Sequence, residues 1–416
     1  MNYSRSVFFV ILIFLSYFSQ ANEQANENDN QYLLTKETYN LLNEIRDAME
    51  EENYQIAVQK LNSYLGKDTI KPYDTAVVYQ TLGYAYNGLN NYVLSIESFV
   101  KATTANALPD NVTHELDYII AQSLIHTEEY TQGLSYLDKW FENEPSPSSE
   151  SHLLAATAYY QINQFKQMIP HAKSAIKKSD APQQSWYELL LAGYYETSMY
   201  KDAALLLEKM IINYPDNDSY WLQLAAVYQQ NRQEKKGLAV SELAYEKGML
   251  KGNAIIQLAQ TYLYLQMPLK SATILETGLN NGQVEVSKIN IELLSNSWLL
   301  AHEPEQAAIL LNRFAKDFDD ASLYYKLGHI YVELEDWNNA KNALELAVSG
   351  HALKNLQDLE SNAWLLLGIS SYHQKDTLRS RQALDKALGF KETREQAAWW
   401  LEQIEEESAK ASNSKT

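Results

Sequence analysis

The side chains of this chain that could do chemistry are histidines, carboxylates and tyrosines, because the sequence has no cysteine. None of the eight histidines lies three or four residues from another, so no helix would present two of them to one metal ion. The phosphate-binding motif G-x-x-x-x-G-K-[ST] and the nucleophile motif G-x-S-x-G are both missing from the sequence. Adjacent acids such as Glu128 and Glu129 are typical of solvated helix faces rather than catalytic pairs. The sequence therefore predicts no enzyme, no cofactor site and no metal site.

The elements that position these side chains repeat about every 34 residues. A large residue, a leucine three positions later and a tyrosine four further recur as Tyr187-Leu190-Tyr194, Trp221-Leu224-Tyr228 and Ile255-Leu258-Tyr262. This spacing is one face of a helix. A second helix follows in each unit, with a small residue such as Ala203 facing the first. Two helices in 34 residues, repeated many times, predict a solenoid rather than a globular enzyme domain.

The pattern W-x2-L-G-x2-Y, followed by A-x3-F and a proline near the end of the unit, resembles the tetratricopeptide repeat (TPR). The resemblance implies an all-α, right-handed superhelical solenoid of about ten helix-turn-helix units with a C-terminal capping helix. Close packing of each pair, at roughly 8–10 Å, explains small residues such as Gly83 and Gly328 on first helices and Ala340 on a second. The units are expected to start at residues 38, 76, 114, 149, 184, 218, 252, 288, 321 and 361.

The first residues predict export. Arg5 precedes an unbroken apolar run at residues 7–15, and Ser19-Gln20-Ala21 offers small residues where a signal peptidase cleaves. This run is shorter than the roughly 20 residues that span a bilayer, so a cleaved signal is expected, with an uncleaved anchor as the alternative. A disulfide-free exported solenoid fits a bacterial periplasm. The expected organisation is a signal peptide at 1–21, a flexible polar leader at 22–37, the repeat array at 38–388, a capping helix at 389–406 and a disordered tail at 407–416.

The charge balance narrows the class of partner. The chain has 34 basic and 53 acidic residues, a formal net charge of −19. Such a surface argues against nucleic acid, whose phosphates need basic side chains, and against anionic lipid. It favours a partner protein with a basic, extended segment. The oligomeric state does not follow from the sequence.

The resemblance to the TPR family also implies a groove, lined by set positions of each first helix. From the second unit onward none of these positions is Lys or Arg, unlike the TPR class that grips C-terminal carboxylates. Tyrosines with Glu and Gln suit an extended peptide that contains Pro or Lys. About half of the tyrosines could instead pack between helices, because Tyr is commonly half-buried. The predicted groove residues are Tyr84, Tyr118, Tyr160, Glu188, Tyr195, Gln229, Tyr264, Tyr325 and Tyr372.

A second resemblance runs from about residue 115 to 404. The order of the repeats and the residues within them resemble the periplasmic TPR component associated with TonB energy-transduction systems of marine gammaproteobacteria. That family implies TonB, ExbB and ExbD as partners and supplies no active-site residues. The segments that carry the resemblance are Leu137-Asp138-Lys139-Trp140-Phe141, Trp186-Tyr187-Glu188-Leu189-Leu190-Leu191, Tyr214-Pro215 with Tyr220-Trp221-Leu222-Gln223-Leu224, and Ala363-Trp364-Leu365-Leu366-Leu367-Gly368.

The function expected on these grounds is a non-catalytic periplasmic scaffold for protein–protein interaction, accessory to a TonB–ExbB–ExbD complex. Three alternatives stay open. The chain could be an assembly factor for envelope machinery, such as outer-membrane protein insertion, pilus assembly or secretion. It could regulate a cell-wall enzyme, or it could be an enzyme subunit that only positions a substrate.

Overall fold

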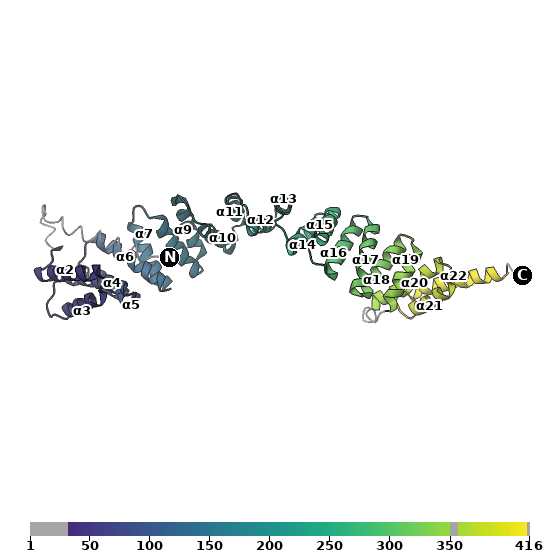
Figure 1. Cartoon of the computed structure of the whole chain (residues 1–416), viewed down its shortest axis with the longest axis horizontal. Coiled ribbons are helices and arrows are strands. Elements are labelled where there is room, and N and C mark those ends of the chain that lie inside the picture. Colours follow the sequence, from purple (N-terminus) through teal and green to yellow (C-terminus); the bar gives the residue numbers. More distant parts are fainter. Residues whose placement is uncertain (1–31, 350–356, 414–416) are drawn as a thin grey trace. The chain divides into compact units, whose positions relative to one another are not determined.

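The structure is a computed structural model that describes residues 32–349 and 357–413. Over these residues it consists of helices and turns, without a β-strand, so the predicted all-α class is confirmed. The chain divides into two compact units at Leu206 and Leu207 (Figure 1). The predicted signal peptide at 1–21 and most of the predicted leader lie outside the described residues.

In unit 1 each helix packs on the next along the chain. The helices come in pairs joined by short turns, with the first helix of a pair followed closely by the second. They are α2 (Lys36–Glu50) with α3 (Tyr54–Leu65), α4 (Pro72–Gly88) with α5 (Tyr92–Thr104), α6 (Asp110–His126) with α7 (Tyr130–Asn143), α8 (Ser149–Gln161) with α9 (Phe165–Lys178), and α10 (Gln184–Glu196).

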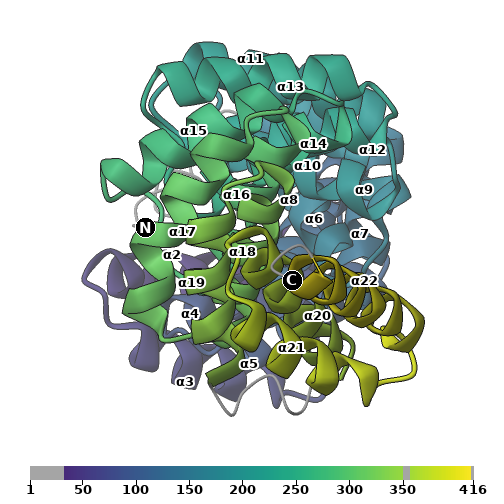
Figure 2. The ribbon, with the colours of Figure 1, turned by 90° about the vertical axis from the view of Figure 1, so that its right-hand side faces the viewer.

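Helix α11 (Tyr200–Asn213) contains the boundary between the units, and unit 2 continues the same alternation. From α16 to α22 each helix packs on the next, as Figure 2 shows. The helices of unit 2 are α12 (Asp218–Gln230) with α13 (Glu234–Glu246), α14 (Asn253–Tyr264) with α15 (Pro268–Asn280), α16 (Lys288–Leu300) with α17 (Pro304–Phe318), α18 (Ala321–Glu333) with α19 (Trp337–Ser349), α20 (Gln357–His373) with α21 (Thr377–Leu388), and the single helix α22 (Arg394–Asn413).

Over the described residues, the expected alternation of helices and the final helix are therefore present, with differences at the edges. Helices α4, α6 and α20 begin four residues before the expected unit starts. Each of them therefore has about one additional helical turn before the first residue of the repeat pattern. Helix α22 starts at Arg394 and continues to Asn413, so residues 407–413, expected in a disordered tail, are helical. Buried Ala397 and Ile404 anchor this helix on its neighbours.

Small residues let the two helices of a pair approach, as predicted. A Cβ atom added to Gly83 of α4 would lie 2.5 Å from the ring of Phe99 on α5. The same added atom on Gly328 would lie 2.5 Å from Leu344, on the opposite helix of its pair. These distances are far shorter than van der Waals contact, so these positions exclude any larger residue without a shift of the helices.

The turn between the two helices of each pair has the same backbone conformation, which the sequence does not predict. One residue of each turn has a left-handed backbone conformation, and this residue is never glycine, for example Asn90 (φ 57°) and His302 (φ 60°). The next N–H donates to a carbonyl five residues back, as from Glu303 to Trp298 (3.0 Å) and from Met267 to Tyr262 (2.8 Å). This Schellman closure satisfies carbonyls that the end of a helix would otherwise leave unpaired.

Tyrosine hydroxyls tie successive pairs together. The hydroxyl of Tyr262 on α14 donates to Glu242 Oε1 on α13 at 2.7 Å, and Tyr228 makes the same bond to Glu208. Burial and this carboxylate raise the pKa of Tyr228 to about 12. Both tyrosines are buried, while their hydroxyls reach the preceding pair.

Candidate functional site

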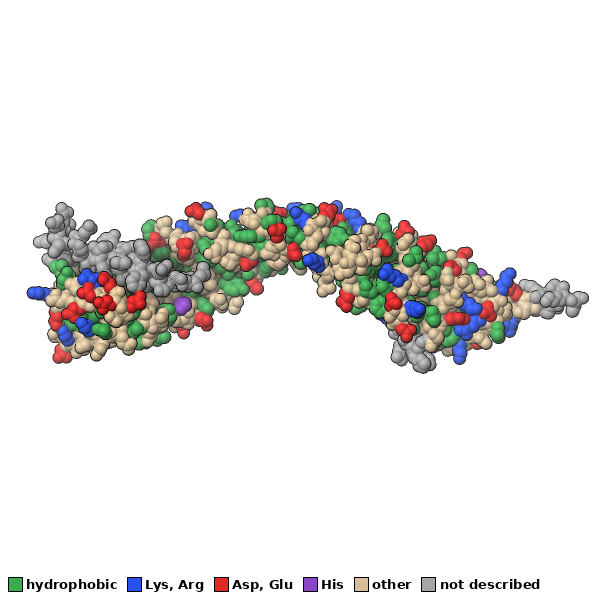
Figure 3. Space-filling model, in the orientation of Figure 1, with side chains coloured by type: hydrophobic (Ala, Val, Ile, Leu, Met, Phe, Trp, Pro, Cys, Tyr) green, Lys and Arg blue, Asp and Glu red, His purple; other side chains and the backbone are tan. Residues whose placement is uncertain are grey.

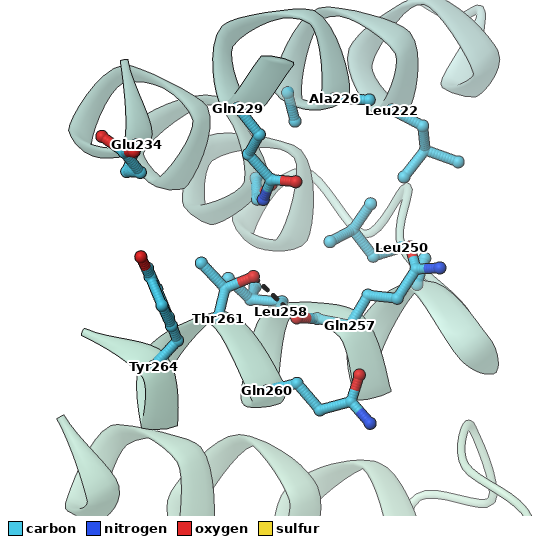
Figure 4. Close-up of a pocket in the computed structure, with 13 residues that line it drawn as sticks. Leu222, Ala226, Gln229, Glu234, Leu250, Gln257, Leu258, Gln260, Thr261 and Tyr264 are labelled. Atoms are coloured by element: carbon cyan, nitrogen blue, oxygen red, sulfur yellow. Dashed lines mark hydrogen bonds between the residues drawn. The ribbon is translucent and has the colours of Figure 1, made fainter. Parts of the chain in front are cut away.

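A cavity of about 630 Å³ lies in unit 2 between α12 and α14 (Figure 4). Its size falls within the roughly 300–1,000 Å³ range of ligand pockets. Two predicted groove residues, Gln229 of α12 and Tyr264 of α14, lie on its wall together. The lining residues are Leu222, Ala225, Ala226, Gln229, Glu234, Ser241, Leu250, Ala254, Gln257, Leu258, Gln260, Thr261 and Tyr264.

The cavity lies between two successive first helices, and α13 with its following connection closes part of it. The connection from α13 to α14 fills part of the gap. It turns at Gly248 and Gly252, both with positive φ, and buries Leu250 between them. The Gly252 N–H donates to the carbonyl of Gln283 at 2.9 Å, which fixes the start of α14.

The walls combine an apolar floor with amide side chains. Figure 4 shows Gln229 pointing from α12 toward the face of α14 that carries Gln257 and Thr261. The Thr261 hydroxyl donates to the Gln257 carbonyl at 2.8 Å, so its proton is already used within α14. A glutamine side chain can both donate and accept, which matches the main chain of an extended peptide. Glu234 contributes an acid, and no lining residue is Lys, Arg or His.

The sequence-based prediction missed the part of this wall that α13 and its following loop supply. Glu234, Ser241 and Leu250 lie outside the first helices, where the repeat pattern predicts no groove residue. Which second-helix residues reach the groove depends on how far the neighbouring first helices stand apart. No signal in the sequence reports that distance.

Three predicted groove residues of unit 1 are exposed or half-buried. Tyr160 is 38% exposed, with its ring edge 5.9 Å from Phe165. Glu188 is exposed and accepts a hydrogen bond from Gln184 Nε2 at 2.9 Å. Tyr195 is half-buried, and this burial raises its pKa to about 12. These three residues come from α8 and α10, two neighbouring first helices, and they remain candidates for partner contact.

Tyr84, a predicted groove residue, is partly buried and packs against the hydrophobic core. Its ring packs edge-on against Phe99 at 5.0 Å, and its hydroxyl oxygen is buried without a hydrogen-bond partner. Burial raises the pKa of Tyr84 to about 12. A ligand in the groove could not reach this hydroxyl, since the neighbouring helices cover it.

Three further tyrosines pack mainly against their own unit. Tyr118 lies against Trp140 with ring centroids 4.5 Å apart. Tyr325 is half-buried, which raises its pKa, and its ring centroid is 6.2 Å from that of His329. Tyr372 donates to Glu407 Oε1 at 2.5 Å, so it holds α22 onto α20. These contacts give the three tyrosines a structural role beside any contact with a partner.

A histidine pair in unit 1 is the densest titratable cluster outside the groove. The Nδ1 atoms of His152 on α8 and His171 on α9 are 3.1 Å apart, and the ring of Phe141 lies against both. The Tyr159 hydroxyl donates to Asp138 nearby, at 2.9 Å from each carboxylate oxygen. Over the described residues no three His, Asp or Glu side chains come close enough to hold a metal ion.

We expect the stability of unit 1 to fall as the pH drops from about 6.5 to about 4. Burial, with His171 and Lys178 nearby, lowers the pKa of His152 to about 4, and burial also lowers that of His171 although Asp138 opposes it. The unfolded chain binds these protons near pH 6.5, before the folded chain does, so acid favours unfolding. Urea denaturation at several pH values measures the effect.

The matched comparison for this pH dependence uses two single variants. His152→Gln should flatten the dependence between pH 6.5 and 4, because it removes a proton site whose pKa differs between the two states. His126→Gln replaces an exposed histidine of the same unit and should leave the dependence unchanged. Equal slopes for His152→Gln and the unmodified protein would contradict the assignment.

Comparison with known proteins identifies the repeats. Residues 76–107, which are most of α4 with α5, and residues 321–349, which are α18 with α19, match the family model described as tetratricopeptide repeat. Each of these two segments is similar to one tetratricopeptide repeat. No curated protein matches the sequence. Over the described residues no helix is long and apolar enough to cross a membrane.

Solved TPR structures share low sequence identity with this chain. A tetratricopeptide repeat protein from Parabacteroides merdae is 12% identical with a TM-score of 0.35, over 63% of this chain and 99% of that one. The TPR2AB domain of yeast Sti1, solved in a complex with pHSP90, is 15% identical with a TM-score of 0.34, over 64% and 98%. YrrB, a TPR protein with an unusual peptide-binding site, is 13% identical with a TM-score of 0.34, over 41% and 85%. Values this low say nothing about what this TPR chain binds.

Proposed function

We propose that this TPR chain is a non-catalytic scaffold of the bacterial periplasm, whose groove between α12 and α14 binds an extended segment of a partner protein. The observation that supports this most directly is the cavity with two glutamine side chains, Gln229 and Gln257, beside an apolar floor. Amides can hydrogen-bond the main chain of a peptide, while the floor accepts its apolar side chains. Tyr264, 76% exposed at the rim, adds a flat ring for proline or a cation.

We propose TonB, working with ExbB and ExbD, as the partner system. The resemblance of residues 115–404 to the TPR component of such systems supports this choice. The net charge of −19 supports it as well, since TonB proteins generally have a Lys/Pro-rich linker. Figure 3 shows acidic side chains spread over the visible face of both units, among basic ones. A basic linker would be attracted to such a surface and could occupy a groove that has no cation of its own.

Affinity purification from gently solubilised envelopes tests this proposal. With a tag placed after Thr416, we expect TonB, ExbB or ExbD to co-purify with the chain and to be identified by mass spectrometry. The double variant Gln229→Ala with Tyr264→Ala should lose them, because it removes a hydrogen-bonding and a ring contact from opposite walls of the groove.

The outcomes of this purification test the partner assignment and the groove assignment separately. Recovery of insertion-machine, pilus or cell-wall proteins would overturn the TonB assignment and favour one of the alternative machines. TonB recovery that the double variant leaves unchanged would place the contact elsewhere on the chain. The matched control is Gln306→Ala, which removes an exposed glutamine of α17 outside the cavity lining.

A further inference from the structure

The last helix places a tryptophan on its solvent side. Buried Ala397 and Ile404 face the preceding pair, and Trp400 is half-buried with its ring 5.1 Å from Tyr372. At 100° per residue, Trp399 points away from these buried residues, and it is 53% exposed. At this exposure, part of the indole ring is available to a partner.

Three glutamates lie beside this tryptophan along one side of the helix surface. Glu395, Glu402 and Glu406 stand four residues before, three after and seven after Trp399, which is the spacing of one helix face. All three are exposed. An indole face next to several carboxylates is the chemistry that recognises a cationic side chain, because the ring and the acids attract the same charge.

The neighbouring rings hold the indole in place. Trp399 lies edge-on to Trp400 at 5.0 Å, and Trp400 lies 6.0 Å from His373. His373 in turn stacks on Trp337 of α19 with centroids 4.0 Å apart and an angle of 14° between the planes. Such a chain of contacts limits the motion of Trp399 before any partner binds, which lowers the entropy cost of binding.

The negative charge of this helix face indicates which kind of partner could bind it. A second copy of the chain docking symmetrically would bring the same face, with its glutamates, against itself, and like charges repel. An anionic lipid surface would be repelled for the same reason. A basic segment of another protein is the occupant that complements both the ring and the acids.

We propose that the solvent face of α22, formed by Trp399 with Glu395, Glu402 and Glu406, docks a basic, extended segment of a partner protein. An Arg or Lys side chain lies on the indole, and the glutamates surround its charge. Arg suits the site better than Lys, because its flat guanidinium stacks on an indole and sheds water more easily. The lining of the α12–α14 groove includes no residue of α22, so this docking does not depend on the function proposed for the groove.

Fluorescence anisotropy with a labelled peptide of alternating Arg and Pro, and the full chain as receptor, tests this proposal. Trp399→Ala should weaken binding roughly tenfold, which is within the range of cation–π contacts. Glu395→Gln with Glu402→Gln should weaken it as well and should reduce its dependence on salt. The same peptide with Lys in place of Arg should bind less tightly, and with Glu it should not bind.

Control variants separate a defined site from the general attraction of an acidic protein. Glu303→Gln with Glu305→Gln removes two exposed charges from the start of α17, and Leu378→Ala removes an exposed apolar side chain of α21. Both should leave binding within twofold of the unmodified chain. The proposal is overturned if Trp399→Ala binds as tightly as the unmodified chain while keeping its melting temperature. It is also overturned if the Glu303 and Glu305 pair matters as much as the α22 pair, or if phosphatidylglycerol vesicles bind through Trp399.

Discussion

Replacing Phe99 with alanine is expected to lower the free energy of unfolding of the first helix pairs by about 3–5 kcal/mol. Phe99 of α5 is fully buried and packs in one cluster with Leu116 and Ile120 of α6. Its ring also fills the space above Gly83, which has no side chain of its own to occupy the cavity left behind. Chemical denaturation followed by hydrogen exchange measures the loss and locates it.

The repeat architecture predicts where the loss appears. Because each pair contacts mainly its neighbours, protection should fall in α4 and α5 while the helices of unit 2 keep theirs. Val93→Ala is the matched control, since Val93 lies on the same helix and is 62% exposed. A loss below 1 kcal/mol for Phe99→Ala, or an equal loss for both variants, would contradict the packing described for this pair.

Replacing Ala226 with tryptophan is expected to weaken partner binding by roughly thirtyfold or more, the range seen when a central contact is lost. Ala226 lies on the α12 wall of the cavity and is exposed to it, so an indole there would occupy the space of the ligand. The binding constant for the partner recovered by affinity purification, measured by calorimetry, gives the effect.

A tryptophan elsewhere on the same unit provides the control. Thr277 is exposed on α15 and does not line the cavity, so Thr277→Trp should bind the partner as the unmodified chain does. Both variants should keep their melting temperature, because both positions are exposed. If Ala226→Trp still binds the partner fully, the groove between α12 and α14 is not the binding surface.

The groove residues could be predicted in part. The repeat pattern placed Gln229 and Tyr264 on first helices at groove positions, and the structure puts both on the wall of one cavity. The same pattern placed Tyr84 there, yet its ring lies between two helix pairs. A position in a repeat tells which way a side chain leaves its own helix. It does not tell how much of that side chain its neighbours cover: Tyr84 is partly buried, whereas Tyr264 is 76% exposed.

The backbone conformation of the turns also could not be predicted from the sequence. Left-handed residues inside the pairs include Asn163, Arg232 and Lys375, which share no chemical property that would reveal the turn. Glycine would be the usual sign of this conformation, and none of the pairs uses it there. Their conformation is fixed by the short connection between two packed helices rather than by their own preference.

The sequence by itself determined the all-α class, the period of the helix pairs and the small residues between their helices, because these depend on contacts within about 40 residues of chain. Gly83 opposite Phe99 is such a contact. Only the tertiary structure decided where the first helices separate enough to leave a cavity, that Glu234 and Leu250 reach it, and that Trp399 faces solvent. These features depend on the spacing between whole helix pairs. That spacing is the sum of many packing contacts, and no single position in the repeat encodes it.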